Sequence, residues 1–246
     1  MSIFREIPPT AGLPFYLKDL TPIIFPGKQG NLEDSLKEIL RVNNVHITYS
    51  GTAAFYIILK TLKKISAKKT IIIPSFICPL IPLAINKAGL NTLVCDIETD
   101  SFNFKTEELE RLCLNNKDIL GIVPVHLGGI PVNLSRIESF ARDKGIFIIE
   151  DCAQSFGASY QGKETGTRGD FAFYSLCRGK GVTIYEGGAL VGKPEFFGLI
   201  KDTAEEIEES KPLSELLKLT ELFGYWIFYR PSLFWFAFRL PQEFWK

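Results

Sequence analysis

Apolar runs of strand length alternate along the chain with amphipathic segments of helical length. The apolar runs are rich in β-branched and aromatic residues, and they predict strands over residues 70–73, 92–95, 119–125, 146–149, 171–174 and 189–191. Between several of them apolar positions recur at helical spacing, which predicts helices over residues 31–41, 52–64, 79–87, 106–114 and 134–144. Asn31 is a candidate N-cap, and Gly89 and Gly145 follow two helices as stop signals.

Several predicted strands are apolar on both faces. Residues 71–73 are three isoleucines, and residues 146–149 read Ile-Phe-Ile-Ile. Strands of this kind are covered by helices on both sides, which is typical of a mostly parallel sheet. The alternation therefore predicts an α/β fold with three layers. We place this large domain at residues 1–195, with an N-terminal arm over about residues 1–30.

The pattern changes after the last predicted strand. Residues 202–223 predict a charged amphipathic helix, and the aromatic stretch 223–245 that follows is interrupted by Pro231 and Pro241. We assign residues 196–246 to a helical, aromatic-rich C-terminal region. The aromatic stretch has three interpretations. We favour a helix that packs on a further domain, then a dimer contact, and last a helix at a membrane surface.

Composition excludes several classes of function. Of the 246 residues, 46% are hydrophobic and 23% are charged, which is typical of a folded globular protein. Lysine and arginine together number 28, as do aspartate and glutamate, so no net charge favours a nucleic acid as partner. The five cysteines form no CxxC pair and the two histidines lie far apart, which argues against a metal site and indicates free thiols in a reducing cytoplasm.

Candidate chemistry lies where the predicted strands end, because an open parallel sheet binds ligands beyond the carboxyl ends of its strands. The strand over residues 146–149 is followed by Glu150, Asp151 and, three residues further on, Gln154. Taken alone, these polar residues are also consistent with a solvated turn.

A second candidate is the segment 50–54, Ser-Gly-Thr-Ala-Ala, which opens the helix predicted over residues 52–64. Small residues at a helix N-terminus expose backbone N–H groups to an anion, and the helix dipole adds to the attraction. Taken alone, an ordinary cap by Ser50 is the better interpretation. The segment matches neither GxGxxG nor a Walker loop, so it carries no dinucleotide or NTPase fingerprint.

The third candidate follows the strand predicted over residues 171–174. Ser175 ends that strand, Lys180 comes five residues later, and residues 186–188, Glu-Gly-Gly, precede the next strand. Taken alone, Lys180 is most simply a surface lysine. The three candidates in this order are nevertheless the parts that pyridoxal 5'-phosphate (PLP) needs. These parts are an anion site for the phosphate, an acid for the ring nitrogen and an amine for a Schiff base.

Four segments in register resemble the DegT-type (StrS-like) sugar aminotransferases. That family shows Ser-Gly-Thr-x-Ala, Val-His-Leu-x-Gly, Glu-Asp-x-Ala-Gln, and Ser-x-x-x-x-Lys followed by Gly-Glu-Gly-Gly. The matching segments here are residues 50–54, 125–129, 150–154 and 175–188. Order and spacing agree over about residues 50–191. The resemblance implies PLP as the cofactor and a large domain of PLP fold type I, as in aspartate aminotransferase.

The resemblance also implies roles for the matching polar residues. Lys180 would form the Schiff base and then carry the proton between substrate and cofactor. Asp151 would pair with the pyridinium nitrogen, and Gln154 would lie beside the ring near its 3-hydroxyl. Thr52, Ala53 and Ser175 would hold the phosphate.

Three positions depart from the family pattern. Cys78 stands where members often place an aromatic residue over the ring, with Phe76 close by. Cys177 stands where the family frequently has histidine, and Tyr185 replaces the glycine before Glu186. None of these changes removes a group that the chemistry requires.

The function implied by the resemblance is the transamination of a nucleotide-linked keto-sugar, with glutamate as amino donor, by a cytoplasmic homodimer in polysaccharide biosynthesis. A related branch of the family that dehydrates sugars has histidine in place of the lysine, and Lys180 argues against that activity. Members usually extend beyond this length, so residues 196–246 are expected to begin a truncated small domain. The alternative is an impaired or non-catalytic PLP-binding remnant that acts through association.

Overall fold

The computed structural model describes residues 16, 31–183, 185–207 and 212–244. The N-terminal arm expected over about residues 1–30 therefore lies, apart from residue 16, outside the described residues. The chain divides into two compact units, and the larger one spans Gly30–Glu208. This unit carries every candidate site residue, so its architecture is described first.

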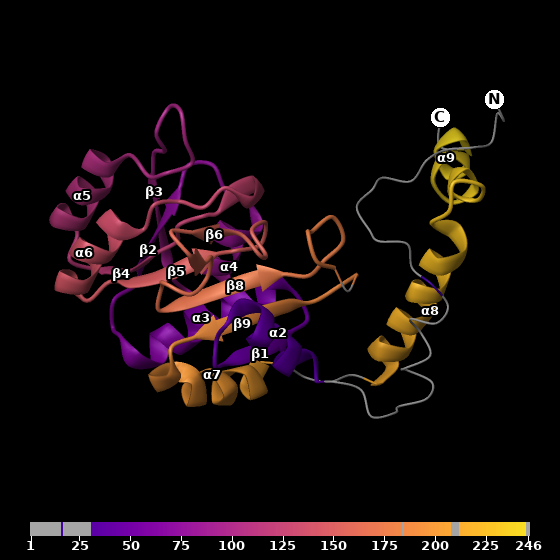
Figure 1. Cartoon of the computed structure of the whole chain (residues 1–246), viewed down its shortest axis with the longest axis horizontal. Helices are drawn as coiled ribbons and strands as arrows, with labels where there is room; N and C mark the ends of the chain where they lie inside the picture. Colours follow the sequence, from indigo (N-terminus) through magenta and orange to yellow (C-terminus); the bar gives the residue numbers. More distant parts are fainter. Residues whose placement is uncertain (1–15, 17–30, 184, 208–211, 245–246) are drawn as a thin grey trace. The chain divides into compact units, whose positions relative to one another are not determined.

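The larger unit is built on a seven-stranded sheet with the order β1-β9-β8-β5-β4-β2-β3 (Figure 1). Its strands are β1 Val45–Thr48, β2 Thr70–Pro74, β3 Asn91–Cys95, β4 Ile119–Ile122, β5 Phe147–Asp151, β8 Phe171–Ser175 and β9 Gly188–Gly192. Neighbouring strands from β3 to β8 pair in parallel, while β9 pairs antiparallel with both β8 and β1. The prediction of a mostly parallel sheet is confirmed.

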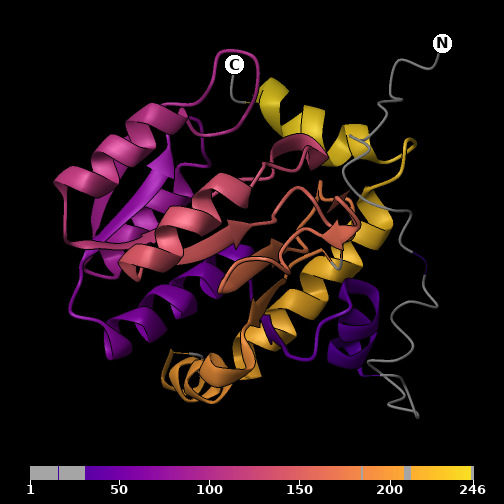
Figure 2. The same cartoon turned by 60° about the vertical axis from the view of Figure 1, so that its left-hand side comes forward.

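Helices cover both faces of this sheet (Figures 1 and 2). The helices are α2 Leu32–Leu40, α3 Gly51–Ile65, α4 Leu80–Lys87, α5 Thr106–Asn115, α6 Ser135–Lys144 and α7 Pro194–Ile207. Helices α3, α4 and α7 contribute to one core cluster together with Ile149 of β5. Helices α5 and α6 pack in a second cluster with Ile148, the preceding residue of the same strand. Because successive side chains of a strand point to opposite faces, the two clusters lie on opposite sides of the sheet, and the three-layer prediction is confirmed.

Local signals in the sequence explain where several helices begin and end. The Asn31 side chain accepts a hydrogen bond from the Glu33 N–H, as an N-cap does. Gly145 ends α6 in the left-handed conformation, with φ of 56°, which glycine adopts without steric cost. Both expectations are confirmed.

Three elements differ from the predicted pattern. Strand β1 was not predicted, and neither was the small hairpin of β6 Ser159–Tyr160 and β7 Lys163–Glu164. The helix expected over residues 202–223 falls on parts of α7, which is described to Ile207, and of α8 Pro212–Phe228, and residues 208–211 between them lie outside the described residues.

The smaller unit contains α8 and a further helix, α9 Phe234–Phe244. Tyr229 and Phe234 pack edge to face across the turn between them, with ring centroids 5.4 Å apart. Pro231 lies in that turn as expected, but the expected interruption at Pro241 is wrong, because α9 continues through it. No helix among the described residues combines the length and the apolar character needed to cross a membrane.

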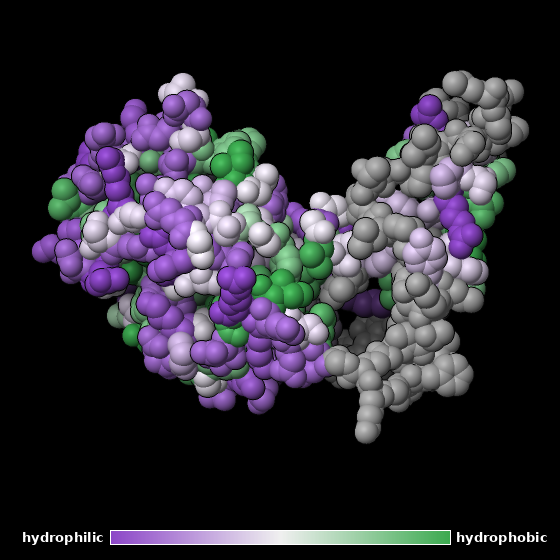
Figure 3. Space-filling view, viewed as in Figure 1, coloured by the Kyte–Doolittle hydropathy of each residue, from purple (hydrophilic) through white to green (hydrophobic). Residues whose placement is uncertain are grey.

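The large domain was expected to end at residue 195, just after the start of α7 at Pro194. Ile200 and Ala204 of α7 are buried in the same cluster as α3. The larger unit continues to Glu208, so α7 is part of the body that holds the sheet. The visible surface of this body is mainly hydrophilic, with apolar residues between the charged ones (Figure 3).

Candidate functional site

The three candidate segments meet at one edge of the sheet. Strands β5 and β8 are parallel neighbours, so their carboxyl ends, Asp151 and Ser175, lie at the same edge. Helix α3 begins at this edge as well, because Ser50 forms a bridge with Gly187 just before β9. The structure thus brings together segments that are more than 100 residues apart in the sequence.

The first turn of α3 is packed closely against the ends of β8 and β9. A methyl group added to Gly51 would lie 3.0 Å from the Ser175 Cβ. One added to Gly188 would lie 2.4 Å from the carbonyl carbon of Ser50, a separation that real Cβ atoms essentially never show. The absence of side chains at these two glycines is what lets the helix start reach the strand ends.

The N–H groups of this turn have different partners. Ser50 is the N-cap, and its side-chain oxygen accepts a hydrogen bond of 3.1 Å from the Ala53 N–H. The N–H groups of Gly51 and Thr52 belong to the first turn and have no acceptor within the helix. Of the predicted phosphate ligands, Thr52 therefore offers its N–H and hydroxyl, whereas the Ala53 N–H already serves the cap.

Asp151 is a buried carboxyl group with few partners. Its side chain accepts a hydrogen bond of 3.0 Å from the Ala153 N–H, and the residue is 4% exposed. Among the described residues no second hydrogen-bond donor to this carboxyl is seen. Burial raises the pKa of Asp151 to about 6, although the Ala153 N–H and the positive charge of Lys180 both act to lower it.

Lys180 lies in the loop that connects β8 to β9. The loop is closed by hydrogen bonds from the Leu176 N–H to the Gly187 carbonyl, 2.9 Å, and from the Arg178 N–H to the Tyr185 carbonyl, 3.2 Å. The positive charge of Lys180 lowers the pKa of Asp151, so these two predicted catalytic residues lie within range of electrostatic interaction. Tyr185 has a φ of 72°, in the left-handed region, which explains why a glycine is the usual residue at this position.

Gln154 and Cys78 lie at the same edge of the sheet. The Gln154 side-chain oxygen accepts a hydrogen bond of 3.1 Å from the Gly128 N–H, which leaves its NH₂ group as a donor. Cys78 is exposed in the segment after β2. Phe76 stacks on Phe102, with ring centroids 6.4 Å apart, so its ring already has a partner.

Glu150 is buried beside the site, and its role could not be inferred from the sequence. Its carboxylate accepts hydrogen bonds from three backbone N–H groups, those of Gly166, Arg168 and Gly169, at 2.8, 2.8 and 2.6 Å. His126 supplies the fourth at 2.9 Å. Burial raises the pKa of Glu150, but the His126 and backbone hydrogen bonds outweigh it and the pKa is lowered.

His126 belongs to the segment 125–129 that matches the family's Val-His-Leu-x-Gly. Its Nδ1 accepts a hydrogen bond of 3.1 Å from the Val132 N–H, so the ring proton lies on Nε2 and is donated to Glu150. Both ring nitrogens are therefore engaged inside the protein. His126, Glu150 and Cys152 could together be considered as metal ligands, because their ligand atoms lie within 4.8 Å of one another. Burial raises the pKa of the Cys152 thiol, which disfavours the thiolate that binds metals, and His126 and Glu150 are already engaged in hydrogen bonds within the protein.

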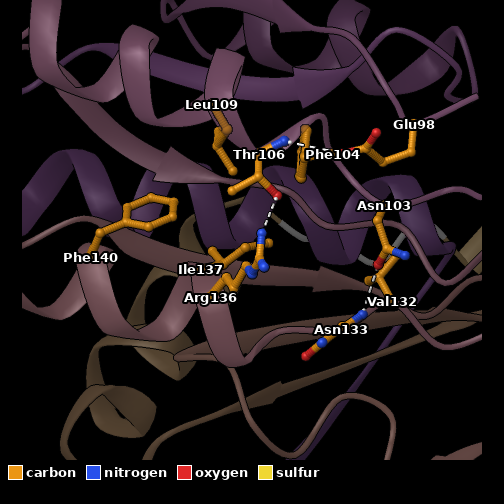
Figure 4. Close-up of a pocket in the computed structure, with 10 residues that line it drawn as sticks. All are labelled: Glu98, Asn103, Phe104, Thr106, Leu109, Val132, Asn133, Arg136, Ile137 and Phe140. Atoms are coloured by element: carbon orange, nitrogen blue, oxygen red, sulfur yellow. Dashed lines mark hydrogen bonds between the residues drawn. The ribbon is translucent and has the colours of Figure 1, made fainter.

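A cavity of about 230 Å³ lies elsewhere in the unit, where α5 and α6 begin (Figure 4). Arg136 points into it and donates a hydrogen bond of 3.4 Å to the Thr106 hydroxyl. Glu98 and Asn103 also line it. None of the site residues predicted from the sequence contributes to this cavity.

Similarity to known proteins identifies the family of this chain. The family model for the DegT/DnrJ/EryC1/StrS aminotransferases matches residues 26–197. The chain belongs to this family. A GDP-perosamine synthase of Escherichia coli O157:H7 is 31% identical to this chain over 151 residues, which are 59% of this chain and 41% of the synthase. The UDP-4-amino-4,6-dideoxy-N-acetyl-beta-L-altrosamine transaminase of Campylobacter jejuni is 31% identical over 177 residues, 71% of this chain and 46% of the relative.

Solved structures of the same kind share the fold. The Helicobacter pylori aminotransferase PseC, involved in the biosynthesis of pseudoaminic acid, superposes with a TM-score of 0.71 at 22% identity, over 85% of this chain and 57% of its own. A DegT/DnrJ/EryC1/StrS aminotransferase from Brucella abortus gives 0.64 at 28% identity, over 69% of this chain and 47% of its own. The chain thus spans about half the length of the relatives that it matches.

Proposed function

We propose that this family member binds PLP through a Schiff base to Lys180 and transfers an amino group to a nucleotide-linked keto-sugar. The observation that carries the proposal is the Asp151 carboxyl, which is buried, lacks a second donor among the described residues and lies within electrostatic reach of Lys180. A buried carboxylate of this kind favours a cationic partner, and a pyridinium N–H supplies both a charge and a hydrogen-bond donor.

The surrounding residues fit the other parts of PLP. The phosphate would lie at the start of α3, near the Gly51 and Thr52 N–H groups, with Ser175 on the facing strand end. The Gln154 NH₂ group would donate to the ring hydroxyl, and Cys78 would cover the ring as a small apolar group. When bound, PLP supplies an electron-withdrawing ring that makes a carbon-bound proton of the substrate removable.

Lys180 and Asp151 then have distinct tasks. The Lys180 Nζ would hold the cofactor and, once released, would carry a proton between substrate and cofactor carbon atoms. Asp151 keeps the ring nitrogen protonated, which requires a carboxylate, and a pKa of about 6 leaves the group mostly ionised at neutral pH.

The substrate class rests on the relatives. One is described as a GDP-perosamine synthase and another as a transaminase of a UDP-linked amino sugar, so both names combine a nucleotide with an amino sugar. Because the two nucleotides differ, the proposal extends to the class and not to one compound. Glutamate as amino donor, a cytoplasmic homodimer and a place in polysaccharide biosynthesis complete the proposal, and they follow from the family resemblance.

The first test is the absorbance of the purified chain after addition of PLP. Schiff-base formation with a lysine shifts the visible absorbance of PLP, and this shift is expected for the wild type and absent from Lys180→Ala. Arg178→Ala, in the same loop, serves as a control for loop damage and is expected to retain the shift. A wild-type chain without the shift, or a Lys180→Ala chain that keeps it, would contradict the assignment.

A second candidate is a PLP-binding protein without transaminase activity. It is the alternative that the sequence left open, and the chain spans 41% and 46% of the length of the two relatives above. Addition of glutamate to the PLP-loaded chain separates the two candidates. Conversion of bound PLP to its amine form supports the aminotransferase, whereas binding of PLP without conversion supports the second candidate.

A further inference from the structure

We propose that Glu150 is a positioning residue, which through His126 and the segment 126–132 sets the orientation of Asp151 and Gln154 toward the cofactor. This inference rests on the proposed function, because it assigns the two site residues to the binding of PLP. Its structural content, a chain of hydrogen bonds from a buried carboxylate to two site residues, is independent of PLP.

The first link is the opposite orientation of two neighbouring acids on β5. Asp151 shares a face of the sheet with Ile149, whose side chain packs in the cluster formed with α3. Glu150 points to the other face, where it is 1% exposed. Helix α3, the candidate phosphate-binding helix, thus lies on the same face of the sheet as the Asp151 side chain, and the Glu150 carboxylate lies on the opposite face.

The second link is the fixed geometry of the Glu150 carboxylate. Its two oxygens accept four hydrogen bonds, which is the full capacity of the group. Three come from the turn over residues 166–169 that leads into β8. A methyl group on Gly166 would lie 2.0 Å from the Tyr174 hydroxyl, so this turn is also held by its packing. Such a carboxylate has little freedom to move.

The third link passes through His126 to the site. The His126 N–H donates to the Asp151 carbonyl at 3.0 Å, and the Asp151 N–H donates to the Pro124 carbonyl at 2.9 Å. The His126 ring connects Glu150 to the Val132 N–H. The segment between His126 and Val132 is therefore tied at both ends.

The fourth link is Gly128, inside that tied segment. Its N–H donates to the Gln154 side-chain oxygen, which leaves the NH₂ group as the donor. Gly128 has a φ of 60°, a left-handed conformation that glycine adopts without steric cost. Glu150 therefore influences Asp151 through the backbone and Gln154 through Gly128.

The test compares Glu150→Gln with wild type. Glutamine has the same shape, but its NH₂ group would face backbone N–H donors, so the hydrogen bonds cannot all form. We expect the dissociation constant for PLP to rise about tenfold, since one or more hydrogen bonds to a charged group are lost. We also expect the pH midpoint of the bound-PLP absorbance to shift. Asp118→Asn is the matched control, because Asp118 also binds backbone and side-chain donors but at the amino end of β2.

A merely structural role predicts a different result. It would lower the unfolding temperature and leave the affinity and pH midpoint of the folded, PLP-loaded fraction unchanged, which would overturn the proposal. If Glu150→Gln does not fold, His126→Gln and His126→Leu replace it. Glutamine can donate to Glu150 and accept from Val132, so His126→Gln is expected to keep the wild-type midpoint and His126→Leu to shift it. Wild-type midpoints in both variants would contradict the inference.

Failure of the proposed function gives a separate signal. If the wild-type chain binds no PLP, the function fails, and hydrogen exchange at the Gly128 amide of the unloaded chain tests the inference alone. We expect faster exchange at Gly128 in Glu150→Gln than in Asp118→Asn. Equal exchange rates in the two variants would overturn the hydrogen-bond link.

Discussion

At the scale of single residues, two neighbouring acids on one strand end have opposite properties. Glu150 accepts four hydrogen bonds and its pKa is lowered, whereas Asp151 accepts one and its pKa is raised to about 6. The difference arises from the two faces of the strand. Glu150 meets backbone donors, and Asp151 is buried with one N–H donor on a face that in the proposed function receives a cationic ring.

The raised pKa of Asp151 predicts a pH dependence of stability in the chain without PLP. The folded state binds this proton up to about pH 6, while the unfolded state loses it near the ordinary pKa of 3.8. The contribution of Asp151 to the free energy of unfolding therefore falls as pH rises from about 4 to about 6, by up to roughly 3 kcal/mol, and is constant above. Asp151→Asn is expected to remove this fall, as measured by urea unfolding at several pH values.

Lys180 offers a check on the sign of this effect. Its positive charge lowers the pKa of Asp151, so Lys180→Ala in the chain without PLP is expected to extend the fall to higher pH. Identical pH profiles in wild type and Asp151→Asn would show that Asp151 does not titrate in this range.

At the scale of elements, the site depends on how closely α3 approaches β8 and β9. The contact between the start of α3 and the start of β9 is made by Gly51 and Gly188, so no side chain separates the two backbones. The first turn of α3 is thereby held at the carboxyl end of β8. A Gly–Gly pair after the lysine therefore has a steric reason in this fold, independent of any ligand.

Gly188→Ala tests this packing. The added Cβ would lie 2.4 Å from the Ser50 carbonyl carbon and 2.5 Å from the Gly51 nitrogen, both backbone atoms that cannot rotate away. We expect a loss of about 2 kcal/mol or more in the free energy of unfolding, together with weaker PLP binding. Gly198→Ala is the control, because it lies in α7 with open space around it and is expected to be neutral or to stabilise by up to about 1 kcal/mol. Equal stability of the two variants would contradict the close approach.

At the scale of the whole molecule, the body that holds the site includes α7. This helix follows the last strand, and its residue Ile200 is fully buried among side chains from α3 and the sheet. The smaller unit, with α8 and α9, exposes aromatic side chains such as Phe223, Phe228 and Phe238. The three interpretations of the aromatic stretch stay predictions.

Ile200→Ala in the full chain tests whether α7 is part of this body. Removal of a buried isoleucine is expected to lower the free energy of unfolding by about 2–5 kcal/mol. Glu205→Ala, on the exposed side of the same helix, is expected to change it by less than about 0.5 kcal/mol. Both are measured by urea unfolding. A small effect of Ile200→Ala would place α7 outside the cooperative body.

Much of the fold was predictable because its signals are local. The six expected strands and the five expected helices follow from apolar runs and periodic spacing, and the caps at Asn31 and Gly145 follow from residue chemistry at single positions. Strand β1 was missed because Val45–Thr48 is only four residues long, and its two middle residues are half-buried. Pro241 was misread because helix propensity is a weak guide at a single position, and α9 continues through this proline.

The order of the chemical groups can be seen in the sequence. It contains a small-residue helix start, a strand-end acid and a later lysine, and the four motifs around them resemble one family, to which the chain belongs. Which acid is buried without a second donor, and which is saturated by hydrogen bonds, depends on the tertiary structure. That distinction depends on donors from residues 126 and 166–169, which are 16 to 24 positions away in the sequence and meet Glu150 only when the strands pair.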